Sequence, residues 1–127
     1  MNEAGKPLPT PAPSSSTPLP IASIEDFQKL ALRVGVIVSA EDHPNADRLL
    51  VLKVDVGEEN PRQLVAGIKG SYQAADLIGK HVVVVANLKP ATLRGVESQG
   101  MALAASDGSS IVLLSPERPI GAGTVVK

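Results

Sequence analysis

The chain has 127 residues, of which 43% are apolar and 2% aromatic, and its formal net charge is −1. This length predicts one domain, since domains commonly have roughly 100–200 residues. The lack of cysteine excludes disulfides and thiol catalysis, and one tyrosine with one phenylalanine cannot form a surface on which nucleic-acid bases stack. We find no signal peptide and no apolar run of the ~18 residues that cross a membrane, so we expect a soluble, cytoplasmic protein.

Charge is unevenly distributed along the chain. Residues 21–61 have a net charge of −4, whereas residues 62–96 have a net charge of +4. A basic segment of this kind can form a surface for polyanions even though the whole chain is slightly acidic. The alternative interpretation is an ordinary solvated surface.

The first twenty residues differ in composition from the rest. They contain six of the eleven prolines, followed by serine and threonine. Proline fixes φ and removes a backbone donor, so we predict an extended, disordered tail or linker. We therefore assign residues 1–20 to a tail and residues 21–127 to one folded domain.

The N-terminal half of this domain predicts a short helix and three strands. Ser23, followed by an acidic first turn, is typical of a helix N-cap. The valine-rich run 32–38 predicts a strand in which Gly35 marks a bulge or bend. The alternating run 49–56 and the run 62–68, separated by a Gly/Pro turn, predict a hairpin.

The C-terminal half predicts one or two helical turns over residues 73–78 and a buried strand over 81–88. Three shorter strands are predicted at residues 101–105, 111–114 and 124–126. The resulting order is that of the OB-fold, a mainly β, five-stranded Greek-key barrel with a helix between strands three and four. The short N-terminal helix and the last strands are expected as additions to this barrel.

Known OB-folds bind ligands on the face of strands two and three and through two loops. Here those loops are residues 39–48 and residues 89–100. The polar residues of the first loop are His43, Asn45, Asp47 and Arg48. A single histidine with loop carboxylates is a poor metal site, and a turn-forming role is favoured, so we expect no metal and no cofactor.

The second loop and its flanks combine cations with hydrogen-bonding groups. Lys89 and Arg94 lie on either side of a proline turn, and Asn87, Ser98 and Gln99 add polar side chains. Such residues make most phosphate and ribose contacts, although a solvated loop is the alternative. The sequence around Ser98 lacks the glycine that a nucleophile elbow requires, so we expect no enzymatic activity.

Four motifs occur in order along the chain: HPNADRL at 43–49, VAGIKG at 65–70, VVVANLKP at 83–90 and LRGVESQGM at 93–101. Together they resemble the tRNA-binding domain at the C-terminus of many bacterial methionyl-tRNA synthetases. The same module occurs in free-standing dimeric proteins and in endothelial monocyte-activating polypeptide. The resemblance covers about residues 24–127.

This resemblance implies an OB-fold without catalytic activity, a homodimer, and binding of the tRNA elbow by shape and phosphate contacts. A methionyl-tRNA synthetase catalytic domain is the implied partner unless the chain is a free-standing equivalent. With tRNA as the implied ligand, the residues that we expect to bind it are Lys69, Lys80, Asn87, Lys89, Arg94, Ser98, Gln99 and Met101. The cations would attract the RNA, while Asn87 and Ser98 would fix its register.

Two related families are alternatives. Phenylalanyl-tRNA synthetase β subunits share similar motifs, but their third strand usually continues into Gly-Ala-x-Asn, unlike residues 66–72 here. A secretion-associated, peptide-binding chaperone shares the barrel, and an exposed apolar patch in place of the basic loop would favour it. One departure is Ala31, where the methionyl type usually has Asp, which predicts a missing tie between the helix and the barrel.

Overall fold

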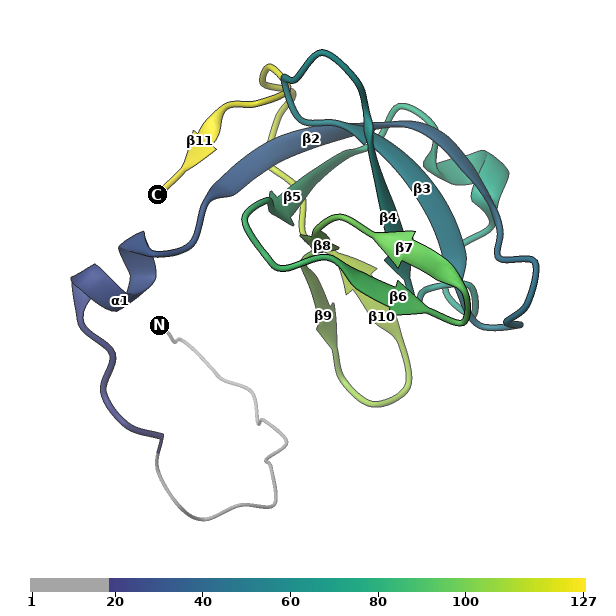
Figure 1. Ribbon diagram of the computed structural model, residues 1–127, viewed down its shortest axis with the longest axis horizontal. Helices are drawn as coiled ribbons and strands as arrows, with labels where there is room; N and C mark the ends of the chain where they lie inside the picture. The colour runs from purple at the N-terminus through teal and green to yellow at the C-terminus, as the bar shows by residue number, and fades with distance from the viewer. Residues whose placement is uncertain (1–18) are drawn as a thin grey trace.

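One long strand, β2, organises the sheet of the computed structural model (Figure 1). Its first half pairs with β5 and its second half with β3, both antiparallel. β4 pairs with β3, and β8 pairs with β5. The strands of this sheet are β2 (Leu32–Asp42), β3 (Leu50–Asp55), β4 (Arg62–Ala66), β5 (His81–Val85), β8 (Met101–Ala102) and, paired with the start of β2, β11 (Val125–Val126). This mainly β, nearly closed barrel confirms the predicted fold class.

The structure describes residues 19–127. The prediction of a disordered tail over residues 1–20 therefore lies outside the described residues, except for Leu19 and Pro20, which are exposed and belong to no regular element. The first regular element of the described residues is α1 (Ile24–Gln28).

The sequence predicts a bulge or bend at Gly35, but the register of β2 against β5 is regular there. The register of β2 against β3 shifts between Ile37 and Ser39, so the bulge lies there. A Cβ atom on Gly35 would lie 2.5 Å from Cγ1 of Val54, which is closer than real contacts allow. Glycine is therefore required at this position because the barrel interior is narrow.

The barrel interior is filled by aliphatic side chains. The face predicted to be buried in residues 49–56 is confirmed, since Leu50, Leu52 and Val54 are all fully buried. Val51, on the opposite face, is buried as well, so the alternation is clear only from Leu52 onwards. Leu50, Leu52 and Val54 pack in one cluster with Leu64 of β4. Burial of a Leu or Val side chain contributes roughly 1.5–3 kcal/mol, so this cluster is the main source of stability.

The barrel closes between the free edge of β4 and the segment that enters β8. The backbone N–H of Gln99 donates to the carbonyl of Gln63 at 2.7 Å. Side chains make three further bonds. Val65 N–H donates to Ser98 Oγ at 3.0 Å, Gln63 N–H donates to Gln99 Oε1 at 3.0 Å, and Gln63 Nε2 donates to the carbonyl of Glu97 at 2.7 Å. Side-chain oxygens thus satisfy backbone donors that would otherwise remain unpaired at a sheet edge.

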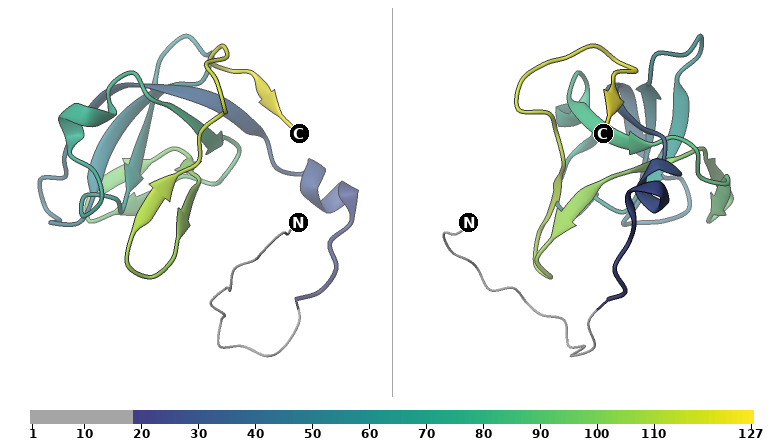
Figure 2. Two further views of the ribbon diagram at one scale, coloured as in Figure 1. Left: turned by 180° about the vertical axis from the view of Figure 1, so that it is seen from behind. Right: turned by 90° about the vertical axis from the view of Figure 1, so that its left-hand side faces the viewer.

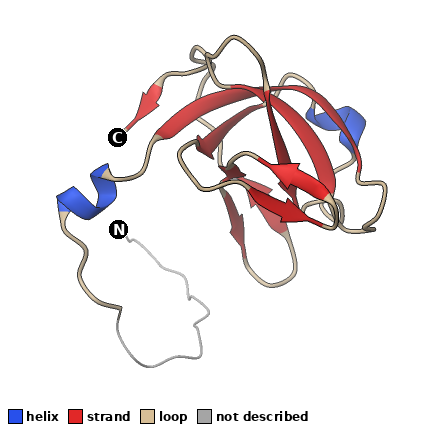
Figure 3. Ribbon diagram, in the orientation of Figure 1, coloured by secondary structure: helices blue, strands red, loops and turns tan. Residues whose placement is uncertain are grey.

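Several elements differ in extent from the sequence prediction (Figure 3). β5 ends at Val85 rather than at residue 88, and β2 continues to Asp42 rather than ending at residue 38. The segment predicted as the second loop contains a hairpin. The smaller elements are η1 (Ala74–Leu77), β6 (Ala91–Leu93), β7 (Val96–Ser98), β9 (Ala104–Ser106), β10 (Ile111–Leu113) and β11 (Val125–Val126). η1 is a 3-10 helix at the predicted helical turn.

The C-terminal strand lies beside the start of the first strand of the sheet. β11 pairs with the start of β2, as the views in Figure 2 show. Ser23 and Asp26 form the predicted N-cap as a capping box. The sequence predicts that Ala31 lacks a contact between the helix and the barrel, but Asn87 supplies one. Its Oδ1 accepts from Ala31 N–H at 2.8 Å, and its Nδ2 donates to the carbonyl of Lys29 at 2.7 Å.

Replacement of Ser98 tests the barrel closure. Ser98→Ala leaves the Val65 N–H without its acceptor in a buried position, so we expect the free energy of unfolding to fall by about 1–3 kcal/mol. Ser115→Ala, at an exposed serine, is the control and should change it by less than about 0.5 kcal/mol. Chemical denaturation measures both. Equal stability of the two variants would show that Ser98 does not contribute to closure.

Candidate nucleic-acid interface

The β6–β7 hairpin carries Arg94, an exposed cation of the predicted second loop. Leu93 pairs with Val96, so only Arg94 and Gly95 form the turn. Their φ angles are 52° and 89°, and positive values at both central residues define a type I′ turn. Such a turn matches the twist of the flanking strands, so the tip of the hairpin is well determined.

The first loop holds the tip of this hairpin. His43 is 6% exposed; its Nε2 donates to the carbonyl of Leu93 at 2.9 Å, while its Nδ1 accepts from the N–H of Asn45 at 2.9 Å. Asn45 Nδ2 also donates to the carbonyl of Arg94 at 3.4 Å. Both ring nitrogens of His43 are therefore engaged and are not free to bind a metal. The two loops that the sequence singled out lie together because of these contacts.

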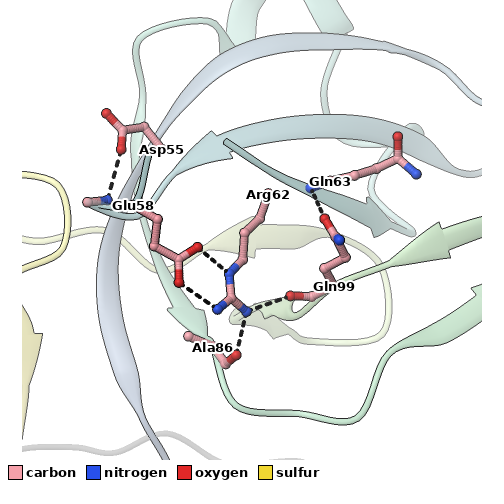
Figure 4. A network of polar contacts seen from close by, with 7 residues as sticks. Asp55, Glu58, Arg62, Gln63, Ala86 and Gln99 are labelled. Atoms are coloured by element: carbon pink, nitrogen blue, oxygen red, sulfur yellow. Dashed lines mark hydrogen bonds and ion pairs between the residues drawn. The ribbon is translucent and has the colours of Figure 1, made fainter. Parts of the chain in front are cut away.

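Arg62 fixes the base of the same hairpin (Figure 4). Its Nη1 donates to the carbonyls of Ala86 and Gln99, which lie on either side of the hairpin. Its Nε and Nη2 donate to the carboxylate of Glu58 at 2.8 and 2.7 Å. These hydrogen bonds lower the pKa of Glu58 and raise that of Arg62.

Sequence reasoning did not select Arg62 as a functional residue. A signal was present, because Glu58 and Arg62 have opposite charges and flank the turn between the second and third predicted strands. Pairs across such a turn are neighbours in a hairpin. The sequence gives no indication of the two carbonyls that Arg62 binds, because they are distant along the chain.

The predicted cations differ in their exposure and in whether they form ion pairs. Lys89, Arg94 and Arg48 are exposed, and within residues 19–127 none of them forms an ion pair. Lys69 is partly buried and pairs with Asp42 at 3.2 Å. Lys80 is also exposed and outside these ion pairs, but it lies away from the hairpin. The other three lie on the hairpin, at its base and in the first loop that contacts it. They are therefore the residues best placed to meet a polyanion.

The other predicted site residues have different positions. Lys80 precedes β5 and lies at the end of that strand opposite to the hairpin. Asn87, Ser98 and Gln99 use their side chains for the internal bonds described above, so they position the hairpin. Met101 is 47% exposed in β8.

A shallow groove lies between the first loop and the turn of the β9–β10 hairpin, and it is lined by Arg48 and Lys69 as well as by Asp47. The nearby Asp107 accepts hydrogen bonds from the backbone N–H groups of Ser109 and Ser110, which lower its pKa to about 2. Asp107 is thus a fixed negative charge at neutral pH. Lys69 is paired with Asp42, so Arg48 is the cation of this groove that forms no ion pair within residues 19–127.

Within residues 19–127, no helix has the length and apolar character that crossing a membrane requires.

A family model described as "Putative tRNA binding domain" matches residues 32–125. The chain belongs to this tRNA-binding domain family. It is 55% identical over 103 residues to the methionine–tRNA ligase of Thermococcus onnurineus and 54% identical over 105 residues to that of Thermococcus kodakarensis. These matches cover 81% and 83% of this chain but only 14% of each ligase.

Solved structures agree with this assignment. A MetRS-related protein from Pyrococcus horikoshii superposes with a TM-score of 0.79 at 31% identity, covering 86% of this chain and 100% of that one. The chaperone CsaA from Bacillus anthracis gives 0.78 at 33% identity, covering 85% and 100%. The identity to the ligases is higher than to the chaperone, so the tRNA-binding assignment is better supported. The matched part of the ligases is the C-terminal tRNA-binding domain, and this domain is an accessory, non-catalytic module.

The Glu58–Arg62 pair predicts a pH dependence of stability. The pKa of Glu58 is below its ordinary value of 4.5 in the folded protein. Its contribution is therefore fully present above pH 4.5 and is lost as the pH falls through the lowered pKa. We expect wild type to melt at a higher temperature than Glu58→Gln near neutral pH, and this difference to shrink in acid. Thermal melts from pH 7 to pH 2 measure it, and a constant difference would contradict the assignment.

Proposed function

We propose that this domain captures tRNA at its elbow, by shape and phosphate contacts, through the surface formed by Arg48, Lys89 and Arg94. The observation that carries the proposal is that these exposed cations lie on loops bound to each other by His43 and Asn45. Phosphate contacts position a protein on RNA without reading sequence, and structured RNA is recognised largely by shape. A family of tRNA-binding domains supports this choice of polyanion.

The catalytic domain of a methionyl-tRNA synthetase is the proposed partner of this module. The support is the identity to methionine–tRNA ligases, of which the chain spans 14%. In such an arrangement the module would raise the affinity of the catalytic domain for tRNA, because linked binding sites act at a high effective concentration.

We also propose that the domain forms a homodimer through its N-terminal helix and C-terminal strand. Ile24, Phe27 and Leu30 are 62%, 40% and 43% exposed, and α1 has no buried residue. In Figure 2 this helix stands clear of the barrel, next to β11, where Val125 is 53% exposed. A five-residue helix is marginal without tertiary packing, so a covering partner surface would stabilise it.

Salt titrations of tRNA affinity test the proposed surface. Each phosphate that a cation neutralises releases counterions, so Lys89→Ala and Arg94→Ala should each flatten the log–log slope by roughly 0.7–0.9. Both should weaken binding to many tRNAs about equally. Lys80→Ala removes the same charge at the opposite end of β5 and should leave affinity and slope close to wild type.

Wild-type affinity and slope in both hairpin variants would show that the binding surface lies elsewhere. An unfolded peptide should not compete with tRNA. Competition by such a peptide at similar concentrations would instead favour the function named for the chaperone neighbour.

Light scattering tests the proposed dimer. At micromolar concentration the wild-type domain should have the mass of two chains, and Phe27→Ser should have the mass of one, because it removes apolar surface from the proposed interface. Val112→Ser, at an exposed valine of β10, is a control that should remain dimeric. A single-chain mass for wild type would refute the dimer.

A further inference from the structure

Arg94 has an unusual backbone conformation for an arginine. Within residues 19–127 it is the one residue other than glycine with a positive φ. The first central position of a type I′ turn strongly prefers Asn, Asp or Gly, because a longer side chain is disfavoured in the left-handed region. The neighbouring Gly95 follows the preference, and Arg94 does not.

The fold does not require the guanidinium at this position. The side chain of Arg94 is exposed, and within the described residues it makes no hydrogen bond or ion pair. The contact that does involve Arg94 uses its backbone carbonyl, which accepts from Asn45. Any residue would supply that carbonyl, and Asn would supply it with less strain.

A strained residue that persists without a structural reason is a sign of function. We propose that Arg94 is kept in this turn, at the expense of fold stability, because its guanidinium contacts the phosphodiester backbone of the bound RNA. We propose further that His43 and Asn45 are positioning residues that hold the turn around Arg94 and do not contact the RNA. This inference rests on the proposed function and assigns the roles within its surface.

The positioning role of His43 and Asn45 follows from the backbone atoms that accept their hydrogen bonds. His43 and Asn45 bind the carbonyls of Leu93 and Arg94, which belong to the two peptide units on either side of the Cα of Arg94. His43 is buried, so it cannot reach an RNA on the surface. Holding the turn before binding reduces the entropy lost when the RNA binds, and this raises affinity without adding a phosphate contact.

Arg94→Asn tests the strain and the contact together. The resulting Asn-Gly turn should raise the melting temperature, while tRNA affinity at low salt should fall several-fold with a slope flattened by roughly 0.7–0.9. Arg118→Asn removes an exposed, ion-paired arginine outside the proposed surface and should change neither the slope nor the affinity. A lower melting temperature, or unchanged affinity and slope, in Arg94→Asn would overturn the inference.

Variants of the first loop separate positioning from contact. His43→Leu removes the donor to Leu93 and should lower tRNA affinity at every salt concentration while leaving the slope at the wild-type value. His43→Gln, which keeps an N–H donor, should recover part of the affinity. Asn45→Ala, at an exposed residue, should repeat the His43→Leu result more weakly without threatening the fold. A flattened slope in these variants, or no loss of affinity, would refute the positioning role.

These outcomes are distinguishable from failure of the proposed function. If the wild-type domain binds no tRNA, the proposed function and this inference both fail. If wild type binds tRNA with a steep salt slope but Arg94→Asn does so equally, the inference alone fails.

Discussion

The structure depends on how the edge of β4 is closed. A β-barrel needs its last edge paired, because unpaired backbone groups are costly when buried and attract other strands when exposed. Here the closure uses the side chains of Ser98 and Gln99 as acceptors for backbone N–H groups of β4. Arg62 then binds the carbonyls of Ala86 and Gln99 next to this closure.

This closure determines what the β6–β7 hairpin can do. The hairpin leaves the sheet at Ala86 and returns at Gln99, so Arg62 and the closure fix its base, while His43 fixes its tip. A hairpin of this size would be marginally stable alone. Attached at both ends, it presents Lys89 and Arg94 in a definite geometry, which suits recognition of RNA by shape.

Much of the fold follows from the sequence because its signals are local. The buried face of Leu50, Leu52 and Val54 and the N-cap at Ser23 each depend on a few neighbouring residues, and the structure confirms them. The steric role of Gly35 was not predictable, because the narrow interior near Val54 depends on packing between strands. The β6–β7 hairpin was missed because its strands have three residues each, too few for a periodicity.

The site was predictable in its residue types and not in their roles. Charge patterning selected Lys89 and Arg94, and both are exposed on the hairpin. The same reasoning grouped Asn87 and Ser98 with them, since polar side chains near cations look alike in a sequence. Asn87 binds backbone groups of Lys29 and Ala31, and Ser98 accepts from the backbone of Val65, all more than thirty residues away, which no local pattern encodes.

The central claim is that tRNA binds to the surface made by the hairpin and the first loop. Hydrogen–deuterium exchange of the domain with and without saturating tRNA tests it most directly, because it locates the bound surface without any substitution. We expect tRNA to slow exchange of the backbone amides over residues 43–48 and 88–97, and to leave it unchanged at residues 78–81, at the far end of β5. Protection at residues 78–81 or in the β9–β10 hairpin, with no change over residues 88–97, would contradict it.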